Sequence, residues 1–104
     1  MVTVGLLIRL TAKPGKEQDV EAFLEGVMPL IRNEPDTIAL FAVRFGPGEY
    51  GIVNAFPDEA GRTAHATGPA AAALFGRADE LFASPPAVEP IDILASKLVE
   101  PGLR

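Results

Sequence analysis

The sequence contains no cysteine and no tryptophan, and it has a single histidine. Without cysteine the chain can form neither a disulfide nor a thiolate metal site, and it has no thiol nucleophile. A zinc site would need several carboxylates beside the one histidine, and no spacing of acidic residues supports such a site. Few side chains are therefore available for catalysis.

Basic side chains are also scarce, and they form no cluster. Nine lysines and arginines stand against fourteen acidic residues, which gives a formal net charge of −5. An acidic domain has no electrostatic attraction for phosphate backbones, so we do not expect nucleic acid as a partner. The apolar N-terminal segment lacks the basic flank of a signal peptide and is too short to span a bilayer. We therefore expect a cytoplasmic protein that does not bind membranes.

What the chain does contain is apolar residues in regular patterns. A length of 104 residues predicts a single domain covering 1–104. Alternating apolar residues predict strands over 2–12, 37–45, 50–56 and 88–99. The stripe from Val20 to Ile31 predicts a helix over 16–33, bent near Gly26 because Pro29 interrupts it.

A second helical region starts at Pro57-Asp58-Glu59 and ends at Ser84-Pro85-Pro86. Gly68-Pro69 breaks it into two parts, and Asp58 and Arg62 are spaced for an i, i+4 ion pair. We expect the tail, residues 101–104, to fray.

This order of elements predicts an α+β fold of the ferredoxin-like type, βαββαβ. Such a fold has a four-stranded antiparallel sheet with the helices on one face. The other face would still carry Leu7, Val53 and Ala55, and 48% of the residues are hydrophobic, which is high for a small monomer. We therefore expect a homodimer in which two sheets pack face to face.

Several segments, in this order, resemble one known family. They are RLTAKPGK after the first strand, PLIRNEPD at the end of the first helix, NAFPDEAGRTAH across the third strand and next helix, and SPPAVEP before the last strand. The chain resembles the antibiotic biosynthesis monooxygenase domain family, whose members are dimeric α+β barrels. The resemblance covers nearly the whole chain.

The resemblance implies a cavity between sheet and helices in each subunit. For some members it implies oxidation of polycyclic phenols or quinones by molecular oxygen without metal or flavin, so we expect no cofactor. The haem-degrading branch of these relatives uses an Asn, a Trp and a His at positions that here hold Ile8, Phe56 and an apolar stretch near Leu74 and Phe75. Haem degradation is therefore not expected.

Two polar residues are the candidates for catalysis. Asn54 shares a strand face with Ile52 and Phe56 and should point toward the cavity, where it could donate to a substrate oxygen; alternatively, backbone groups of the neighbouring helix satisfy its amide. His65 is the one side chain whose ordinary pKa suits a base near neutral pH. The alternative for His65 is a partly exposed histidine bonded to backbone or water.

Aromatic side chains are the candidates for substrate binding. Phe56 and Phe75 would form cavity walls, and Tyr50 could hydrogen-bond a phenolic ligand, although an edge tyrosine with its hydroxyl in water is the simpler interpretation. Phe41 and Phe82, and as an alternative Phe75, are expected in the core and could also line the cavity. We expect Asn54, Phe56 and His65 to converge with Tyr50 in one small region.

Three functions fit these observations. The first is a cofactor-free monooxygenase-like enzyme acting on a small hydrophobic aromatic or quinone-type substrate. The second is a non-catalytic dimeric barrel that binds such a molecule. The third is a structural or partner-binding dimer with a collapsed core.

Overall fold

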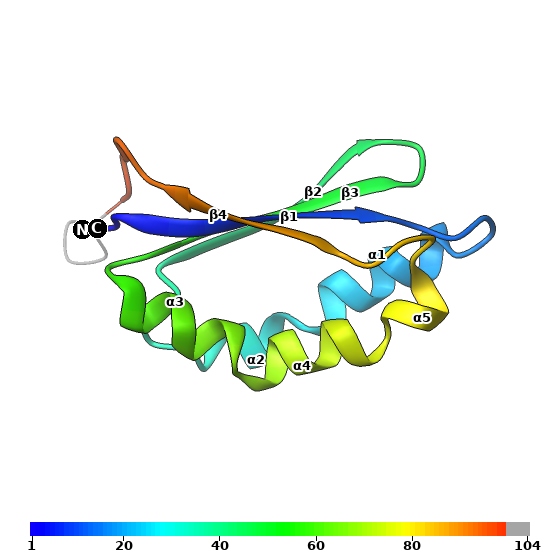
Figure 1. Cartoon of the computed structure of the whole chain (residues 1–104), viewed down its shortest axis with the longest axis horizontal. Helices are drawn as coiled ribbons and strands as arrows, with labels where there is room; N and C mark the ends of the chain where they lie inside the picture. The colour runs from blue at the N-terminus through cyan, green and yellow to red at the C-terminus, as the bar shows by residue number, and fades with distance from the viewer. Residues whose placement is uncertain (100–104) are drawn as a thin grey trace.

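A single sheet and a layer of helices make up the computed structural model, which describes residues 1–99. The predicted fraying of residues 101–104 falls outside this range. The helices gather on one face of the sheet, and the other face is open (Figure 1). In chain order the elements are β1 (Val4–Thr11), α1 (Glu17–Gly26), α2 (Met28–Arg32), β2 (Ala39–Gly46), β3 (Glu49–Phe56), α3 (Glu59–Ala66), α4 (Pro69–Gly76), α5 (Ala78–Leu81) and β4 (Ala87–Asp92).

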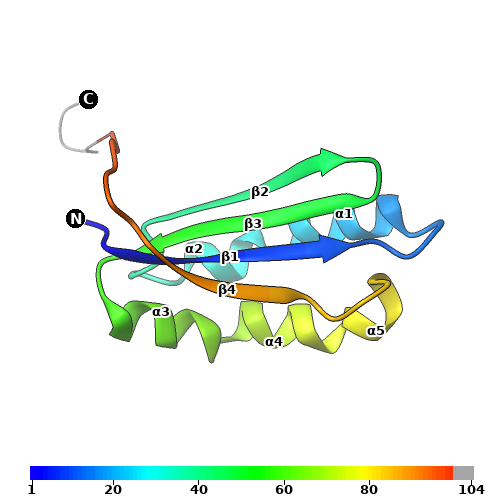
Figure 2. The same cartoon turned by 45° about the horizontal axis from the view of Figure 1, so that its top comes forward.

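The strands lie in the order β2-β3-β1-β4, and each neighbouring pair is antiparallel (Figure 2). This arrangement confirms the predicted ferredoxin-like fold. Within residues 1–99, the two outer strands, β2 and β4, each pair with a single neighbour. The turn between β2 and β3 uses Gly48 at φ +74°, a left-handed conformation that glycine adopts at little cost.

The register of the central strands decides which side chains face the helices. Leu6 of β1 lies opposite Asn54 of β3, and Ile8 lies opposite Ile52. All four side chains are buried, as the alternating pattern predicts. The main core is formed by Leu6, Ile8, Leu10, Ala12, Val20, Leu24, Tyr50, Ile52, Phe56, Leu74, Leu81 and Phe82.

The predicted bend in the first helical region is present. α1 ends at Gly26, and α2 starts two residues later with Pro29 in its first turn. Proline is tolerated there because the first turn of a helix has no intrahelical acceptor for its backbone N–H. The break lets Val27 and Ile31 pack against Ala70 of α4 as a second, smaller cluster.

The last strand is shorter than the predicted range of 88–99. β4 spans Ala87–Asp92, because its partner β1 begins at Val4, and Val4 already lies opposite Asp92. One further backbone hydrogen bond, of 2.9 Å from the Ile93 N–H to the Thr3 carbonyl, continues the pairing just beyond this last pair. Pro90 is accommodated because β4 is an edge strand, where a missing backbone donor costs no ladder hydrogen bond.

The predicted ion pair between Asp58 and Arg62 is wrong. Asp58 is the N-cap of α3 in an extended conformation, and its Oδ1 accepts a hydrogen bond of 3.0 Å from the backbone N–H of Gly61. Arg62 instead donates from Nε to Oε1 of Glu59 at 3.1 Å. As the N-cap residue, Asp58 directs its carboxylate toward the helix backbone.

The open face of the sheet carries large apolar side chains. Phe41 is 63% exposed and Phe45 is 57% exposed, so the expectation that Phe41 lies in the core is wrong. A Cβ at Gly51 would lie 2.7 Å from Phe45 Cε2, so the absence of a side chain there lets the ring lie against the strand. The Arg9 guanidinium lies 5.5 Å from the centre of the Phe45 ring.

Candidate functional site

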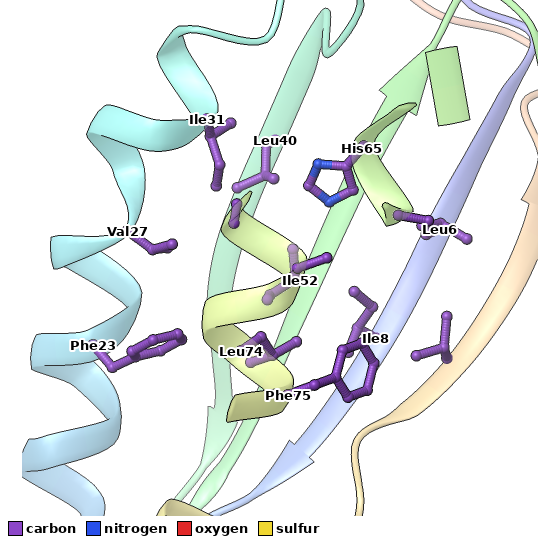
Figure 3. A pocket seen from close by; sticks show the side chains of 14 residues that line it. Leu6, Ile8, Phe23, Val27, Ile31, Leu40, Ile52, His65, Leu74 and Phe75 are labelled. Carbon is purple, nitrogen blue, oxygen red and sulfur yellow. The ribbon is translucent and has the colours of Figure 1, made fainter. Parts of the chain in front are cut away.

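A cavity of about 230 Å³ lies between the sheet and the helices. Side chains from both layers converge on it, and His65 is the one with a polar group among the described residues that line it (Figure 3). The apolar lining consists of Leu6, Ile8, Phe23, Val27, Ile31, Leu40, Ile52, Ala66, Ala70, Ala71, Leu74, Phe75 and Val88.

The cavity reaches the surface between α4 and the edge strand β4. Phe75 of α4 and Val88 of β4 both line it, and they are 52% and 43% exposed. Phe75 therefore lies in the cavity wall at its mouth and not in the core, and its role in binding a substrate stays a prediction.

His65 is held by a carboxylate from a distant loop. It sits in the last turn of α3, and its Nδ1 lies 2.6 Å from Oε1 of Glu34. The same oxygen accepts a hydrogen bond of 2.7 Å from the Thr37 hydroxyl. The Phe56 ring packs against the imidazole with 5.4 Å between ring centres. The alternative interpretation of His65, a partly exposed histidine bonded to backbone or water, is therefore wrong, since His65 is buried and paired with a side chain.

Asn54 contacts the other side of the imidazole. Its Oδ1 accepts a hydrogen bond of 2.9 Å from the backbone N–H of Leu6, and its Nδ2 lies 3.4 Å from Nε2 of His65. The amide is 1% exposed and is not among the cavity-lining residues. Its partners are a neighbouring strand and the histidine, whereas the sequence interpretation offered either a ligand or a neighbouring helix.

These contacts determine which imidazole nitrogen carries the proton. The Leu6 N–H can only donate, so it fixes Oδ1 of Asn54 toward β1 and leaves Nδ2 toward His65. The Glu34 carboxylate can only accept, and at 2.6 Å from Nδ1 it is the contact that places the proton of the neutral ring on Nδ1. The longer approach of the Nδ2 donor to Nε2, 3.4 Å, is compatible with this tautomer. Nδ1 then donates to the Glu34 carboxylate. The lone pair of a neutral imidazole is thus on Nε2.

Glu34 was not identified from the sequence. It lies 31 residues before His65, in the segment Glu34-Pro35-Asp36 that directly follows the helix predicted over 16–33. The sole signal was general: a buried histidine needs a partner for its ring N–H. Nothing in the local pattern says which of the acidic residues supplies it.

Tyr50 lies outside this cavity, and the prediction that its hydroxyl is in contact with water is wrong. Tyr50 is buried under α1, and its hydroxyl donates a hydrogen bond of 2.6 Å to Oε2 of Glu21, which also accepts one of 3.0 Å from Arg44. The Tyr50 hydrogen bond, followed by the one from Arg44, lowers the pKa of Glu21 below its ordinary 4.5. The same hydrogen bond, with burial, raises the pKa of Tyr50 above 10.0.

The remaining aromatic candidates divide between core and surface. Phe56 is fully buried and supports His65, but it is not among the residues that line the cavity. Phe41 lies on the open face of the sheet, opposite Val53, and Phe82 is in the core as expected. Of the four predicted substrate-binding residues, Phe75 alone contacts this cavity.

The described residues contain neither a metal-binding cluster nor a membrane-spanning helix. Within residues 1–99 there is no group of three or more His, Cys, Asp or Glu side chains placed to hold a metal ion. Over the same residues, no helix is long and apolar enough to cross a membrane.

Comparison with known proteins identifies relatives by structure. The sequence matches no model of a protein family. No curated protein matches it significantly. The solved structure of NE2512 from Nitrosomonas europaea, a protein of unknown function, is 46% identical with a TM-score of 0.94 and covers 96% of this chain and 97% of its own.

More distant structures share the fold. A candidate antibiotic biosynthesis monooxygenase from Caulobacter crescentus is 18% identical, with a TM-score of 0.78 over 90% of this chain and 92% of its own. Rv0793 from Mycobacterium tuberculosis is also 18% identical, with a TM-score of 0.76 over 95% of this chain and 98% of its own. The predicted resemblance is confirmed: the chain belongs to the family of the Nitrosomonas protein NE2512, and its fold is that of the candidate antibiotic biosynthesis monooxygenases.

Proposed function

We propose that the cavity binds a small hydrophobic aromatic or quinone-type molecule and that the protein oxidises it with molecular oxygen without a bound cofactor. The observation that carries this proposal is one polar side chain, His65, in an otherwise apolar cavity. In the neutral ring the lone pair lies on Nε2, and contacts with Glu34 and Asn54 set the position of the ring. A hydroxylated aromatic would bury its rings against aliphatic walls and present its acidic group to the imidazole.

The volume indicates the size of the ligand. A cavity of about 150 Å³ is enough to hold benzene, and pockets for drug-sized molecules start at roughly 300 Å³. At about 230 Å³ the cavity suits one or two rings, such as a naphthol or a naphthohydroquinone. Haem is far larger than this space, in agreement with the missing residues of the haem-degrading branch.

In the proposed reaction His65 is the general base. Nε2 removes the acidic proton of the substrate, and the resulting anion gives electrons to molecular oxygen, which bonds to a ring carbon. The hydroperoxide then loses water to leave a carbonyl group. One oxygen atom enters the product and the other leaves as water with the two hydrogens that the substrate loses. The substrate is thus the reductant and oxygen the oxidant.

The existing contact at Nε2 is compatible with this role. A separation of 3.4 Å from Asn54 Nδ2 is beyond the usual range for an N–H donor, about 2.7–3.2 Å. A substrate hydroxyl can therefore compete for the lone pair at small cost. The predicted role of Asn54 as a donor to a substrate oxygen stays a prediction, and it requires the ligand to reach between the amide and the ring.

Oxygen uptake tests the proposal directly. Naphthols and naphthohydroquinones are assayed with wild type, with His65→Gln and with Thr63→Ala, an exposed position on the same helix. We expect uptake above autoxidation in wild type and in Thr63→Ala, and a loss of roughly 100-fold or more in His65→Gln. Wild-type uptake equal to autoxidation across the panel, or full activity of His65→Gln, would refute the catalytic role.

One observation favours a second function, the non-catalytic binding of such a molecule. Both nitrogens of His65 already have partners in the protein, Glu34 and Asn54. A binding protein would be stabilised by about 2.7 kcal/mol at a ligand concentration of 100 times Kd. It would consume no oxygen. Equal thermal stabilisation of wild type and His65→Gln, without uptake by either, would select this alternative.

We also propose that two copies associate through the open face of the sheet. Phe41 and Phe45 are more than half exposed there, beside the partly buried Leu7 and Val53. Exposed apolar clusters of this kind on a small protein mark interaction surfaces. A second copy of the same sheet would cover them about a two-fold axis. Sedimentation velocity at micromolar concentration measures the result, and a stable monomer would refute it.

A further inference from the structure

His65 lines two cavities, and the second of them also has acidic residues in its walls. On one side is the apolar cavity described above. On the other is a smaller cavity of about 170 Å³ beneath the loop that follows α2. Its walls include Glu34, Asp36, Thr37, Ala64 and His65, and we call it the polar cavity after its acidic residues. The charged residues that line this cavity together with His65 are Glu34 and Asp36, and Glu34 is the one in contact with the ring.

Glu34 has one oxygen engaged and one without a protein partner. Oε1 accepts from His65 Nδ1 and from Thr37, whereas Oε2 is buried and has no hydrogen-bond partner among the described residues. A buried carboxylate oxygen left unpaired costs free energy. The polar cavity that Glu34 lines can hold water, which needs roughly 10–15 Å³ of such space. Water in this cavity can therefore donate a hydrogen bond to Oε2 of Glu34.

We propose that Glu34 is the positioning residue of His65, acting from the polar cavity on the side away from the substrate. It keeps the proton of the neutral ring on Nδ1, so that the Nε2 lone pair is available to the substrate. When Nε2 takes the substrate proton, the X–H bond of the substrate breaks and the Nε2–H bond forms. The Glu34 carboxylate then stabilises the imidazolium, and the same proton returns from Nε2 to the peroxide oxygen. This inference rests on the proposed role of His65 as the base.

The two sides of the imidazole have different roles in this proposal. Substrate meets the imidazole in the apolar cavity, while its charge and tautomer are set from a cavity that the substrate does not enter. A carboxylate bonded to Nδ1 performs the same service for the general-base histidine of the serine proteases. Here the carboxylate comes from a loop 31 residues away from the histidine.

The first test reads the tautomer and needs no turnover. Nitrogen-15 NMR of the His65 ring is recorded for wild type, Glu34→Gln and Glu34→Ala, with Asp36→Asn as the matched control in the same cavity. We expect Nδ1–H in wild type, in Asp36→Asn and in Glu34→Gln, whose amide oxygen still accepts. Glu34→Ala should lose this tautomer. A wild-type spectrum in Glu34→Ala would overturn the proposal.

Formate supplies the rescue experiment. In Glu34→Ala, formate should enter the space left by the carboxylate and restore the Nδ1–H signal of His65. Adding Ala64→Leu, which fills the polar cavity, should block the rescue. Adding Ala71→Leu, which places the same side chain in the apolar cavity, should leave the rescue intact. Rescue blocked equally by both, or by neither, would contradict the route through the polar cavity.

Kinetics then separate this inference from the proposed function. If uptake depends on His65, we expect Glu34→Gln to lower kcat by about 100-fold with KM unchanged, because a neutral amide cannot stabilise the imidazolium. Asp36→Asn should keep wild-type kcat. Full kcat in both Glu34 variants would overturn the positioning role while leaving His65 as the base. Absence of His65-dependent uptake would remove the enzyme function alone, and the tautomer and formate results would still decide whether Glu34 positions the ring.

Discussion

Replacing Asn54 by alanine should destabilise the fold, because the amide joins two elements. Its Oδ1 accepts from the buried Leu6 N–H at 2.9 Å, and its Nδ2 contacts His65 at 3.4 Å. Losing the acceptor of a buried N–H costs about 1–3 kcal/mol, and the long contact to the ring adds little. The free energy of unfolding should therefore fall by about 1–3 kcal/mol. For a domain of this size that corresponds to roughly 5–20 °C in Tm.

Denaturant unfolding at one fixed protein concentration measures this loss. The concentration must be fixed because self-association would stabilise the folded state by mass action. Asn33→Ala is the matched control, since the chain has one other asparagine and it is exposed. The control should change stability by less than about 0.5 kcal/mol. If Asn54→Ala is as mild as Asn33→Ala, the amide does not join β1 to α3 as described.

Three further outcomes follow from the geometry. Tyr50 is the one tyrosine in a chain without tryptophan, so absorbance at 295 nm reports its ionisation alone; it should ionise above pH 10, and Glu21→Gln should bring that ionisation to lower pH. Because the pKa of Glu21 is lowered in the folded state, its ionised form stabilises the fold above pH 4.5, and this stability is lost as the pH falls through the lowered value. The difference in unfolding free energy between wild type and Tyr50→Phe, measured with denaturant, should therefore shrink on acidification. A difference that stays constant with pH would contradict the hydrogen bond. Phe41→Asp should give a monomer in sedimentation velocity, whereas Leu94→Asp, at an exposed residue outside the strands, should not.

The fold was predictable because its signals are local and periodic. Alternation in β1 and β3 identified the faces, and Pro29 with Gly26 placed the helix break within a residue or two. The errors concern features fixed by partners. β4 ends at Asp92 because β1 begins at Val4, and no pattern within residues 88–99 records where another strand starts. The Asp58 carboxylate could likewise either pair with Arg62 or cap the backbone of α3, and in the structure it caps the helix.

The candidate site was predictable only in part. The sequence placed Asn54 and Phe56 on one strand face and His65 shortly after it, and these three do meet. Tyr50 shares the face, but it lies four residues away along an extended strand, about 13 Å, under a different helix.

Two further features of the site region were missed for a common reason. Glu34 completes the contact from a loop 31 residues distant. Phe41 was expected in the core because aromatic residues are commonly buried, but its register opposite Val53 puts it on the face without helices. Both depend on long-range pairing, which the spacing of residues along one segment cannot express.

The position of β4 at the edge of the sheet has a consequence for how fast a ligand can come and go. Val88 forms part of the cavity mouth, and the strand that carries it is bonded on one side only, to β1. Pro90 adds a residue without a backbone donor to that same strand. Local opening of an edge strand requires less free energy than global unfolding. Transient separation of β4 from β1 would therefore widen the mouth while the central strands remain paired. The lifetime of a bound molecule would then depend on the rate at which this one strand separates.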